Sequence, residues 1–200
     1  MTTRRPHIEF DRATHTYRVD GVVWPSVTQI LSAFDHELDR VDEDVLNRKA
    51  VFGQAVHRAC ELDDAGILDE SSVHPSVMPY LEQWRRFRRE MQAEVLGNEH
   101  IVVNRLHCYV GTNDRLLRFG RFRRAVCDIK SGMRRPWHEW QTAGYKVAAD
   151  RYDQPVDGRC CIYLSPTNYK LVVHEDDGDC AVFLSMASVY HAFRKKGVLK

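Results

Sequence analysis

The chain has 200 residues, a length typical of one domain with enough chain to bury a core. Its hydrophobic content of 44% and charged content of 28% are close to the globular average and exclude a disordered or fibrous chain. No apolar run reaches the ~18 to 20 residues that cross a membrane, and no secretory signal follows Met1, so we expect a cytoplasmic protein without membrane contact.

The net charge is +1, but charge is unevenly distributed along the chain. Residues 35–70 contain eleven acids against four Lys and Arg, whereas residues 114–135 contain eight Lys and Arg against two acids. The second window could therefore face phosphates. The six cysteines include no Cys-x-x-Cys pair, and we interpret them as reduced apolar fillers rather than as a disulfide framework or a zinc site.

Residues 1–95 are predicted to form a hairpin followed by helices. An Asp-Gly dipeptide at positions 20 and 21, between two β-rich runs, is typical of a two-residue hairpin turn. Ser26 begins a capping-box pattern that predicts a short helix. Apolar residues at helical intervals predict a second helix, which carries His57, and a third helix that starts near Pro75.

Residues 96–175 are predicted to form a catalytic sheet with one helix, and residues 176–200 a final helix. The expected strands cover 101–103, 107–112, 116–119, 122–130, 160–164 and 171–173, and the expected helices cover 137–152 and 181–194. This order predicts one α/β (α+β) domain over residues 1–200, with a central mixed β-sheet flanked by helices. No Gly-x4-Gly-Lys loop is present, so no nucleotide cofactor is expected.

The run Ala125–Gly132 is an apolar strand that acquires Asp128 and Lys130 at its end. Because strand side chains alternate, these two point to the same face, ~6.6 Å apart along the chain. A carboxylate in this position can bind Mg²⁺ or Mn²⁺, and the ammonium can act on a nearby water. A surface cross-strand ion pair is an equally good interpretation of this motif alone.

Three further groups could join that pair. Asp114 is expected at the end of a neighbouring strand, although a turn residue is the alternative. Gln141 and Tyr145 lie four apart and share one face of a helix, where solvated positions are the alternative. His57 follows Gly53 by one helical turn, which allows another backbone to approach; a structural role is the alternative.

The order Gly53-x3-His57, Gly111-x2-Asp114, Asp128-x-Lys130 and Gln141-x3-Tyr145 resembles the PD-(D/E)XK nuclease superfamily. Within it, the chain is similar to the RecB-like and lambda-exonuclease-like branch, which has the helical His and the Gln-x3-Tyr. The similarity extends from about Trp24 to Tyr152. Each motif is weak by itself, whereas four in this order are much more specific.

The resemblance implies a restriction-endonuclease-like core with one site. Asp114 and Asp128 would bind Mg²⁺ or Mn²⁺, together with His57 and the backbone carbonyl of Ile129. Lys130 would activate or position the attacking water. Gln141 and Tyr145 would support the site and the DNA backbone, and Glu99 would match an accessory acid before the first strand. Some relatives hold an iron–sulfur cluster, which is not expected here because no Cys precedes His57.

Arginines close to these residues in sequence are the expected DNA-binding groups, with a solvated strand edge as the alternative. They are Arg115, Arg118, Arg121, Arg123, Arg124, Arg134 and Arg135. Trp137 and Trp140 could stack on an unpaired base, but core packing is the favoured interpretation.

The expected function is metal-dependent hydrolysis of DNA phosphodiester bonds by an exonuclease of recombination, repair or phage DNA processing, in a bacterial or phage-infected cell. DNA is the expected partner, with a single-strand annealing or other recombination protein as a further one; homo-oligomerisation stays open. The alternative is a catalytically silent DNA-binding or assembly protein that keeps the nuclease fold. A non-nuclease metalloprotein is disfavoured by the density of arginines.

Overall fold

The computed structural model describes residues 6–35, 42–149 and 155–199. Its N-terminal part is an antiparallel sheet of β1 (Ile8–Asp11), β2 (Thr16–Val19) and β3 (Val22–Trp24), in that order. Asp20 and Gly21 connect β2 to β3 with φ angles of 50° and 82°, which confirms the predicted hairpin. Strand β1 was not predicted.

Three helices and a short 3-10 turn follow. They are α1 (Val27–Ser32), α2 (Glu43–Asp64), η2 (Glu70–Ser72) and α3 (Met78–Glu90). The capping box of α1 is confirmed: Ser26 Oγ accepts the Gln29 N–H at 3.1 Å, and Gln29 Oε1 accepts the Ser26 N–H at 2.9 Å. Helix α2 begins earlier than its apolar pattern, because the Asp42 carboxylate caps its first turn.

The main sheet has five strands in the order β4-β5-β6-β7-β8. The strands are β4 (Glu94–Asn104), β5 (Tyr109–Phe119), β6 (Phe122–Lys130), β7 (Gly158–Leu164) and β8 (Tyr169–Val173). Helix α4 (Trp137–Ala149) connects β6 to its parallel neighbour β7, and α5 (Gly178–Lys195) ends the fold. The other pairings are antiparallel, which makes the sheet mixed, as predicted.

The largest differences from the sequence-based boundaries lie in β4 and β5. The strands predicted at 107–112 and 116–119 form one strand, β5, because the polar residues between them lie inside the sheet. Strand β4 also starts earlier, at Glu94. Residues 150–152 of the predicted 137–152 helix lie outside the described residues.

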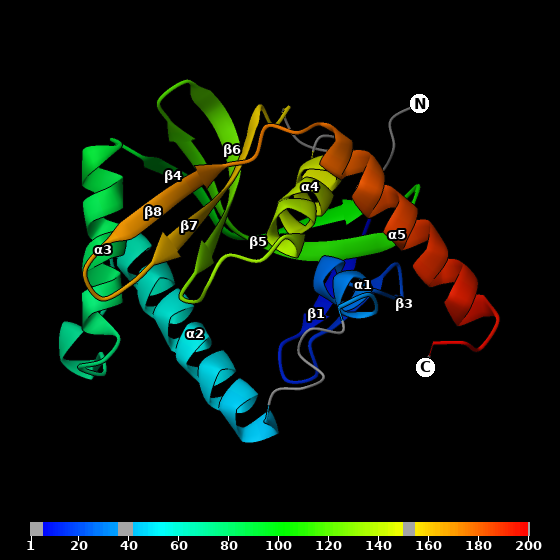
Figure 1. Ribbon diagram of the computed structural model, residues 1–200, viewed down its shortest axis with the longest axis horizontal. Coiled ribbons are helices and arrows are strands. Elements are labelled where there is room, and N and C mark those ends of the chain that lie inside the picture. Colours follow the sequence, from blue (N-terminus) through cyan, green and yellow to red (C-terminus); the bar gives the residue numbers. More distant parts are fainter. Residues whose placement is uncertain (1–5, 36–41, 150–154, 200) are drawn as a thin grey trace.

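Helices cover both faces of the main sheet (Figure 1). Helices α2 and α3 cover one face, where Trp84 and Phe87 pack with Ile129 and Ile162. Helices α1, α4 and α5 cover the other face, where Tyr145 and Phe183 pack with Leu116 and Val126 in a second cluster. The small sheet packs against β4 and β5 through a third cluster, formed by Tyr17, Val19, Val103 and Val110. The fold is therefore a mixed sheet between helical layers.

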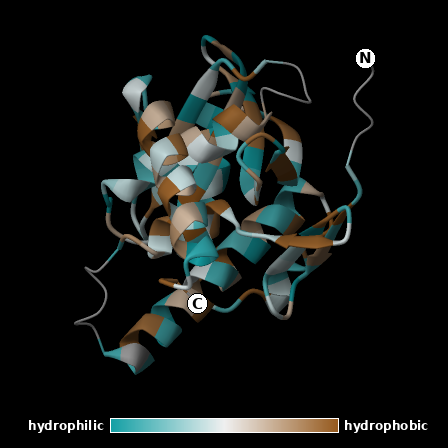
Figure 2. Cartoon of the chain, turned by 90° about the vertical axis from the view of Figure 1, so that its right-hand side faces the viewer, coloured by the Kyte–Doolittle hydropathy of each residue, from teal (hydrophilic) through white to brown (hydrophobic). Residues whose placement is uncertain are grey.

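Hydrophilic residues interrupt the hydrophobic ones along the helices (Figure 2). Accordingly, no helix in the part of the chain that the structure describes has the length and apolar character needed to cross a membrane.

Candidate active site

Strands β5 and β6 separate near the middle of the sheet. Their register runs from the Phe119–Phe122 pair to the Arg115–Cys127 pair. Beyond this point β5 stays paired with β4, and β6 with β7. We call the resulting opening the fork and define it by Asp114, Asp128 and Lys130. Asp114 thus lies inside β5 and not at a strand end as expected; it is the β5–β6 ladder that ends there.

At the fork, the Asp114 side chain accepts a hydrogen bond from the β6 backbone in place of a carbonyl of β5. Its Oδ2 accepts the Ile129 N–H at 2.7 Å, and His57 Nδ1 on α2 lies 3.3 Å from the same oxygen. Burial opposes ionisation of this carboxyl, but the charges of His57 and Lys130 and the Ile129 N–H outweigh it and lower the pKa of Asp114. Conversely, burial lowers the pKa of His57, yet Asp114 leaves it raised overall. The predicted helical His therefore contacts the predicted acid.

Asp128 and Lys130 share one face of β6, as the strand alternation predicted. The intervening Ile129 packs in the opposite core with α2 and α3. The Lys130 ammonium forms an ion pair with Asp128 Oδ2 and donates a hydrogen bond to Gln141 Oε1 at 2.9 Å. Gln141 Nε2 donates to Asp128 Oδ1 at 3.2 Å and to the Tyr145 hydroxyl at 3.0 Å. Gln141, on one face of α4, thus contacts both Asp128 and Lys130.

Charge and burial compete within this cluster. Burial and the negative charge of Asp114 raise the pKa of Asp128 above its ordinary value. Burial lowers the pKa of Lys130, but the carboxylates of Asp128 and Asp114 outweigh it and leave the pKa raised. Two acids and one ammonium therefore form one electrostatic unit.

Two glycines bring the surrounding helices close to the fork. A Cβ at Gly111 would lie 2.7 Å from Cε1 of Tyr145, so only glycine lets the β5 backbone pack against this ring of α4. A Cβ at Gly53 would lie 3.4 Å from Ser131 Oγ, which shows how closely α2 approaches the chain after β6. This nearest atom belongs to a side chain at ordinary contact distance, so the backbone approach expected at Gly53 is not found.

The fork opens into a cleft of about 900 Å³. Its lining comes from the β1–β2 segment, α1, α2, α4 and the strands β4 to β6, and its acidic members are Glu61, Glu99, Asp114 and Asp128. Sequence reasoning missed Glu61, although it follows His57 by four residues and so shares its face of α2.

Glu99 lies inside β4 and not before the first strand, as was expected. Its neighbours Asn98 and His100 pair with Arg115 and Asn113, which brings Glu99 opposite Asp114. Its φ of 46° is unusual for a residue other than glycine within a strand. Burial, followed by the charge of Asp114, raises its pKa to about 7. The accessory acid is therefore part of the cleft.

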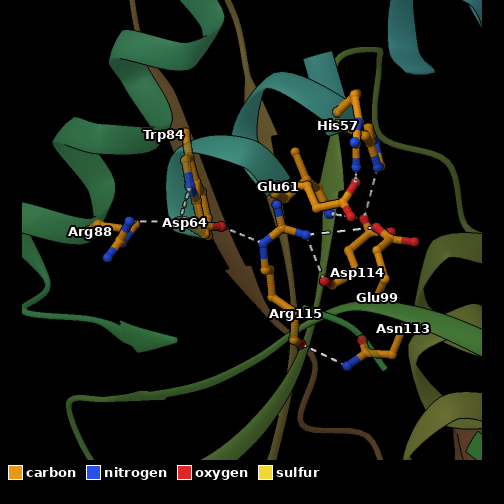
Figure 3. Close-up of polar contacts among 11 residues, drawn as sticks. His57, Glu61, Asp64, Trp84, Arg88, Glu99, Asn113, Asp114 and Arg115 are labelled. Carbon is orange, nitrogen blue, oxygen red and sulfur yellow. Dashed lines mark hydrogen bonds and ion pairs between the residues drawn. The ribbon is translucent and has the colours of Figure 1, made fainter. Parts of the chain in front are cut away.

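Arg115 is buried and paired inside the protein, which contradicts its predicted place among the exposed DNA-binding arginines. The side chain is 0% exposed because strand alternation turns it toward α2 and α3, where its Nε donates to Asp64 Oδ2 at 2.6 Å. Its Nη1 donates to the Asp114 carbonyl at 2.7 Å and lies 3.8 Å from Glu99 Oε1. Figure 3 shows this guanidinium between the cleft acids and the buried Asp64. Arg115 is a structural link behind the cleft.

The other predicted arginines fall into two groups. The first group, which we call the hairpin end, lies around the β5–β6 turn and consists of Arg118, Arg121, Arg123 and Arg124. The second group, Arg134 and Arg135, follows Lys130 on the connection to α4. Trp137 and Trp140 are partly buried against the core cluster of α4, in agreement with the favoured packing interpretation.

The residues expected to bind a metal ion lie together, but their carboxylates are paired with other groups of the protein. Among the described residues, no three His, Cys, Asp or Glu side chains are arranged so that they could hold a metal ion. Asp114 is occupied by His57 and the Ile129 N–H, and Asp128 by Lys130 and Gln141. The donors are nevertheless carboxylates and an imidazole, whose chemistry suits a small divalent cation.

No protein-family model matches the chain, and neither does any curated protein. A solved structure titled "Crystal structure of SSO0001" aligns over 81% of this chain and 81% of its own length, with 15% identity and a TM-score of 0.38. A similarity of this size supports no conclusion about function, so the functional proposal rests on the cleft.

Proposed function

We propose that the chain is a Mg²⁺- or Mn²⁺-dependent deoxyribonuclease that hydrolyses phosphodiester bonds and belongs with the PD-(D/E)XK nucleases it resembles. The observation that carries the proposal is the fork: Asp114, Asp128 and Lys130 come from two diverging strands and line one cleft. Gln141 and Tyr145, on the predicted helix, complete the same hydrogen-bonded cluster.

Hydrolysis of a phosphodiester requires an oriented water, neutralisation of charge on the pentavalent phosphorus and stabilisation of the leaving oxygen. Lys130 supplies a positive charge that Gln141 orients and Asp128 balances. When a substrate phosphate enters, this ammonium can donate to its oxygens and hold a water beside it. Tyr145 holds the Gln141 amide in place from one helical turn away.

A divalent cation bound by Asp114, Asp128, His57 and the Ile129 carbonyl would supply Lewis acidity toward the phosphate. In the structure, Asp114 contacts His57 and Asp128 contacts Lys130, so the four donor groups of such a cation lie in one connected cluster with the lysine.

The biological setting that fits this proposal is exonucleolytic processing in recombination, repair or phage replication, with DNA as partner in a bacterial or phage-infected cytoplasm. A second candidate function is DNA binding without cleavage. It is favoured by one observation: the two acids are satisfied by internal partners and form no ready metal-binding group among the described residues.

The experiment compares cleavage of a fluorescent linear DNA by wild type, Lys130→Met and Asp128→Asn, with Mg²⁺, with Mn²⁺ and with EDTA. We expect cleavage by wild type with metal only, and a rate lower by about 10²–10³-fold in each variant, as for loss of a preorganised charge-stabilising group. Lys170→Met, at an exposed position of β8, is the matched control and should cleave like wild type.

A second readout is thermal unfolding with and without Mn²⁺. Binding to the folded state should raise the unfolding midpoint of wild type, and Asp128→Asn should lose this increase. Equal cleavage by wild type and both variants would overturn the catalytic assignment. DNA binding without cleavage in either metal would instead establish the second candidate.

A further inference from the structure

The β1–β2 segment contributes an aromatic cluster to the cleft. The rings of Phe10 and Tyr17 stack with centroids 4.3 Å apart and an interplanar angle of 16°. The His15 ring meets both edge-on, at 5.4 Å from Phe10 and 5.5 Å from Tyr17. All three line the same cleft as Asp114 and Lys130, and none belongs to the fork.

Two of the three rings contact the core: Tyr17 belongs to the third hydrophobic cluster, and Phe10 packs against that cluster. Tyr17 is buried, and its hydroxyl is 2.7 Å from Thr112 Oγ1 on β5. Phe10 is half-buried and His15 is exposed. The stack therefore extends from the core of the small sheet out into the cleft, where water surrounds its outer members.

The turn that carries these residues is preorganised. Asp11 Oδ1 accepts the Ala13 N–H at 2.9 Å, and Thr14 Oγ1 donates to Asp11 Oδ2 at 2.8 Å. His15 has a φ of 50°, in the left-handed region. A ring held in this way loses little freedom when a ligand packs against it.

The charges that line the cleft determine which part of a ligand can lie against the aromatic cluster. Apart from Lys130, the cleft lining holds the acids Glu61, Glu99, Asp114 and Asp128 together with Arg58, whose guanidinium is paired with Glu61 at 2.6 Å. Arg12 lines the aromatic side, is exposed, and forms no ion pair with any residue that the structure describes. The side with uncharged ring faces and an available cation suits a nucleobase with its adjoining phosphate.

We propose that Phe10, Arg12 and His15, which we call the N-terminal wall, bind an unpaired nucleobase next to the scissile phosphate. The base stacks on the exposed part of the Phe10–His15 cluster, and Arg12 pairs with the adjoining phosphate. Resting on the proposed nuclease function, this makes single-stranded DNA, or a melted strand end, the substrate class. Base pairs inside a duplex are stacked on both faces and have no free base face to offer this wall.

The test measures fluorescence anisotropy in a Lys130→Met background with Mg²⁺, so that the strand stays intact. The probes are a fluorescein-labelled dT oligonucleotide and a strand of equal length built from abasic residues. We expect the dT strand to bind about tenfold more tightly, within the range for stacking of one base on an aromatic side chain. Phe10→Leu and His15→Asn should each reduce this preference, and the double variant should abolish it.

These substitutions keep the fold testable. Leu retains apolar volume at the half-buried position 10, and Asn tolerates the positive φ of position 15. Arg18→Gln, an exposed change on β2 outside the cleft lining, is the matched control and should retain the full preference. Unchanged unfolding midpoints show that a lost preference is not a lost fold.

The two proposals fail separately. Equal affinity of the Lys130→Met protein for both strands, or a preference that survives in the Phe10→Leu/His15→Asn double variant, would overturn the N-terminal wall even if wild type cleaves DNA. A preference for the dT strand in a protein that cleaves with neither Mg²⁺ nor Mn²⁺ would overturn the nuclease and leave the base-binding wall in place.

Discussion

The two ends of the β5–β6 pair carry similar residues in opposite environments. At the fork, Asp114 and Asp128 are buried, and their side-chain partners are a histidine, a lysine and a glutamine. At the hairpin end, two arginines form exposed pairs: Arg118 pairs with Glu94 at 2.7 Å, and Arg121 pairs with Glu175.

The difference shows that the density of charges along the chain does not reveal their role. Asp128 follows Phe122 by six residues, so the turn of the hairpin end lies about 20 Å from the fork at ~3.3 Å per residue, whereas Arg118 and Arg124 lie four residues, or about 13 Å, from Asp114 and Asp128. Burial makes charges interdependent at one end, because removal of one leaves another without compensation. Exposure makes them nearly independent at the other end, because water screens each pair.

The largest expected contrast is in stability, between Arg115→Met and Arg118→Met. Arg115→Met leaves the buried Asp64 without its main cation and should cost about 3 kcal/mol of unfolding free energy, at the low end for a broken buried pair because Arg88 and the Trp84 indole still contact Asp64. Arg118→Met removes an exposed pair and should cost at most about 1 kcal/mol. Urea denaturation measures both.

A double variant separates the electrostatic part of the stability lost in Arg115→Met from the part due to packing. Asp64→Asn in the Arg115→Met background removes the uncompensated carboxylate and should recover part of the lost stability. Equal costs for Arg115→Met and Arg118→Met would mean that the structural role assigned to Arg115 is wrong.

Much of the fold follows from periodicity in the sequence. The hairpin at positions 20 and 21, the capping box of Ser26 and the helix after Lys130 depend on contacts within a few residues, and these could be predicted. The single strand β5 could not, because Thr112–Arg115 has the polar composition of a turn. These residues stay in the sheet because β4, α2 and α4 supply distant partners for them.

The candidate site divides in the same way. Asp128, Lys130, Gln141 and Tyr145 lie within one strand–helix unit, so their proximity could be predicted from short spacings. Glu61 and the N-terminal wall reach the cleft only through packing of segments far apart in sequence. Arg115 was misassigned because its partner Asp64 lies on a helix that the local pattern does not connect to β5.

The fork and the hairpin end should also differ in pH dependence. In the folded chain the pKa of Glu99 is about 7, against an ordinary value of 4.5. Between these values the folded chain keeps a proton that the unfolded chain has lost, so stability should fall as the pH rises from about 4.5 to 7. Glu99→Gln removes this loss, and its unfolding midpoint in EDTA should exceed that of wild type at pH 8 but not at pH 4.5.

We expect a difference of about 2–4 °C at pH 8, which corresponds to about 1 kcal/mol for a chain of this size. The value is modest because a third of the Glu99 side chain is exposed and water screens it. Glu94→Gln, at the exposed partner of Arg118, is the matched control for removal of an acid outside the cleft. A midpoint difference for Glu99→Gln that is the same at both pH values would contradict the raised pKa.

The smallest effect is expected for the hairpin end in DNA binding. A four-nucleotide strand has a stacked length of about 14 Å at 3.4 Å per residue, too short to cover the roughly 20 Å from the fork to Arg121, which lies beside Phe122. Each phosphate contact contributes about 0.7 to the dependence of log affinity on log salt for single strands. Arg121→Gln should therefore leave this slope unchanged, whereas Arg12→Gln, in the N-terminal wall, should lower it by about 0.7. Titrations at several salt concentrations measure both.

If the hairpin-end variant lowered the slope by as much, the strand would have to run along the β5–β6 pair. The arginine-rich residues 114–135 would then regain the DNA-binding role that the sequence predicts.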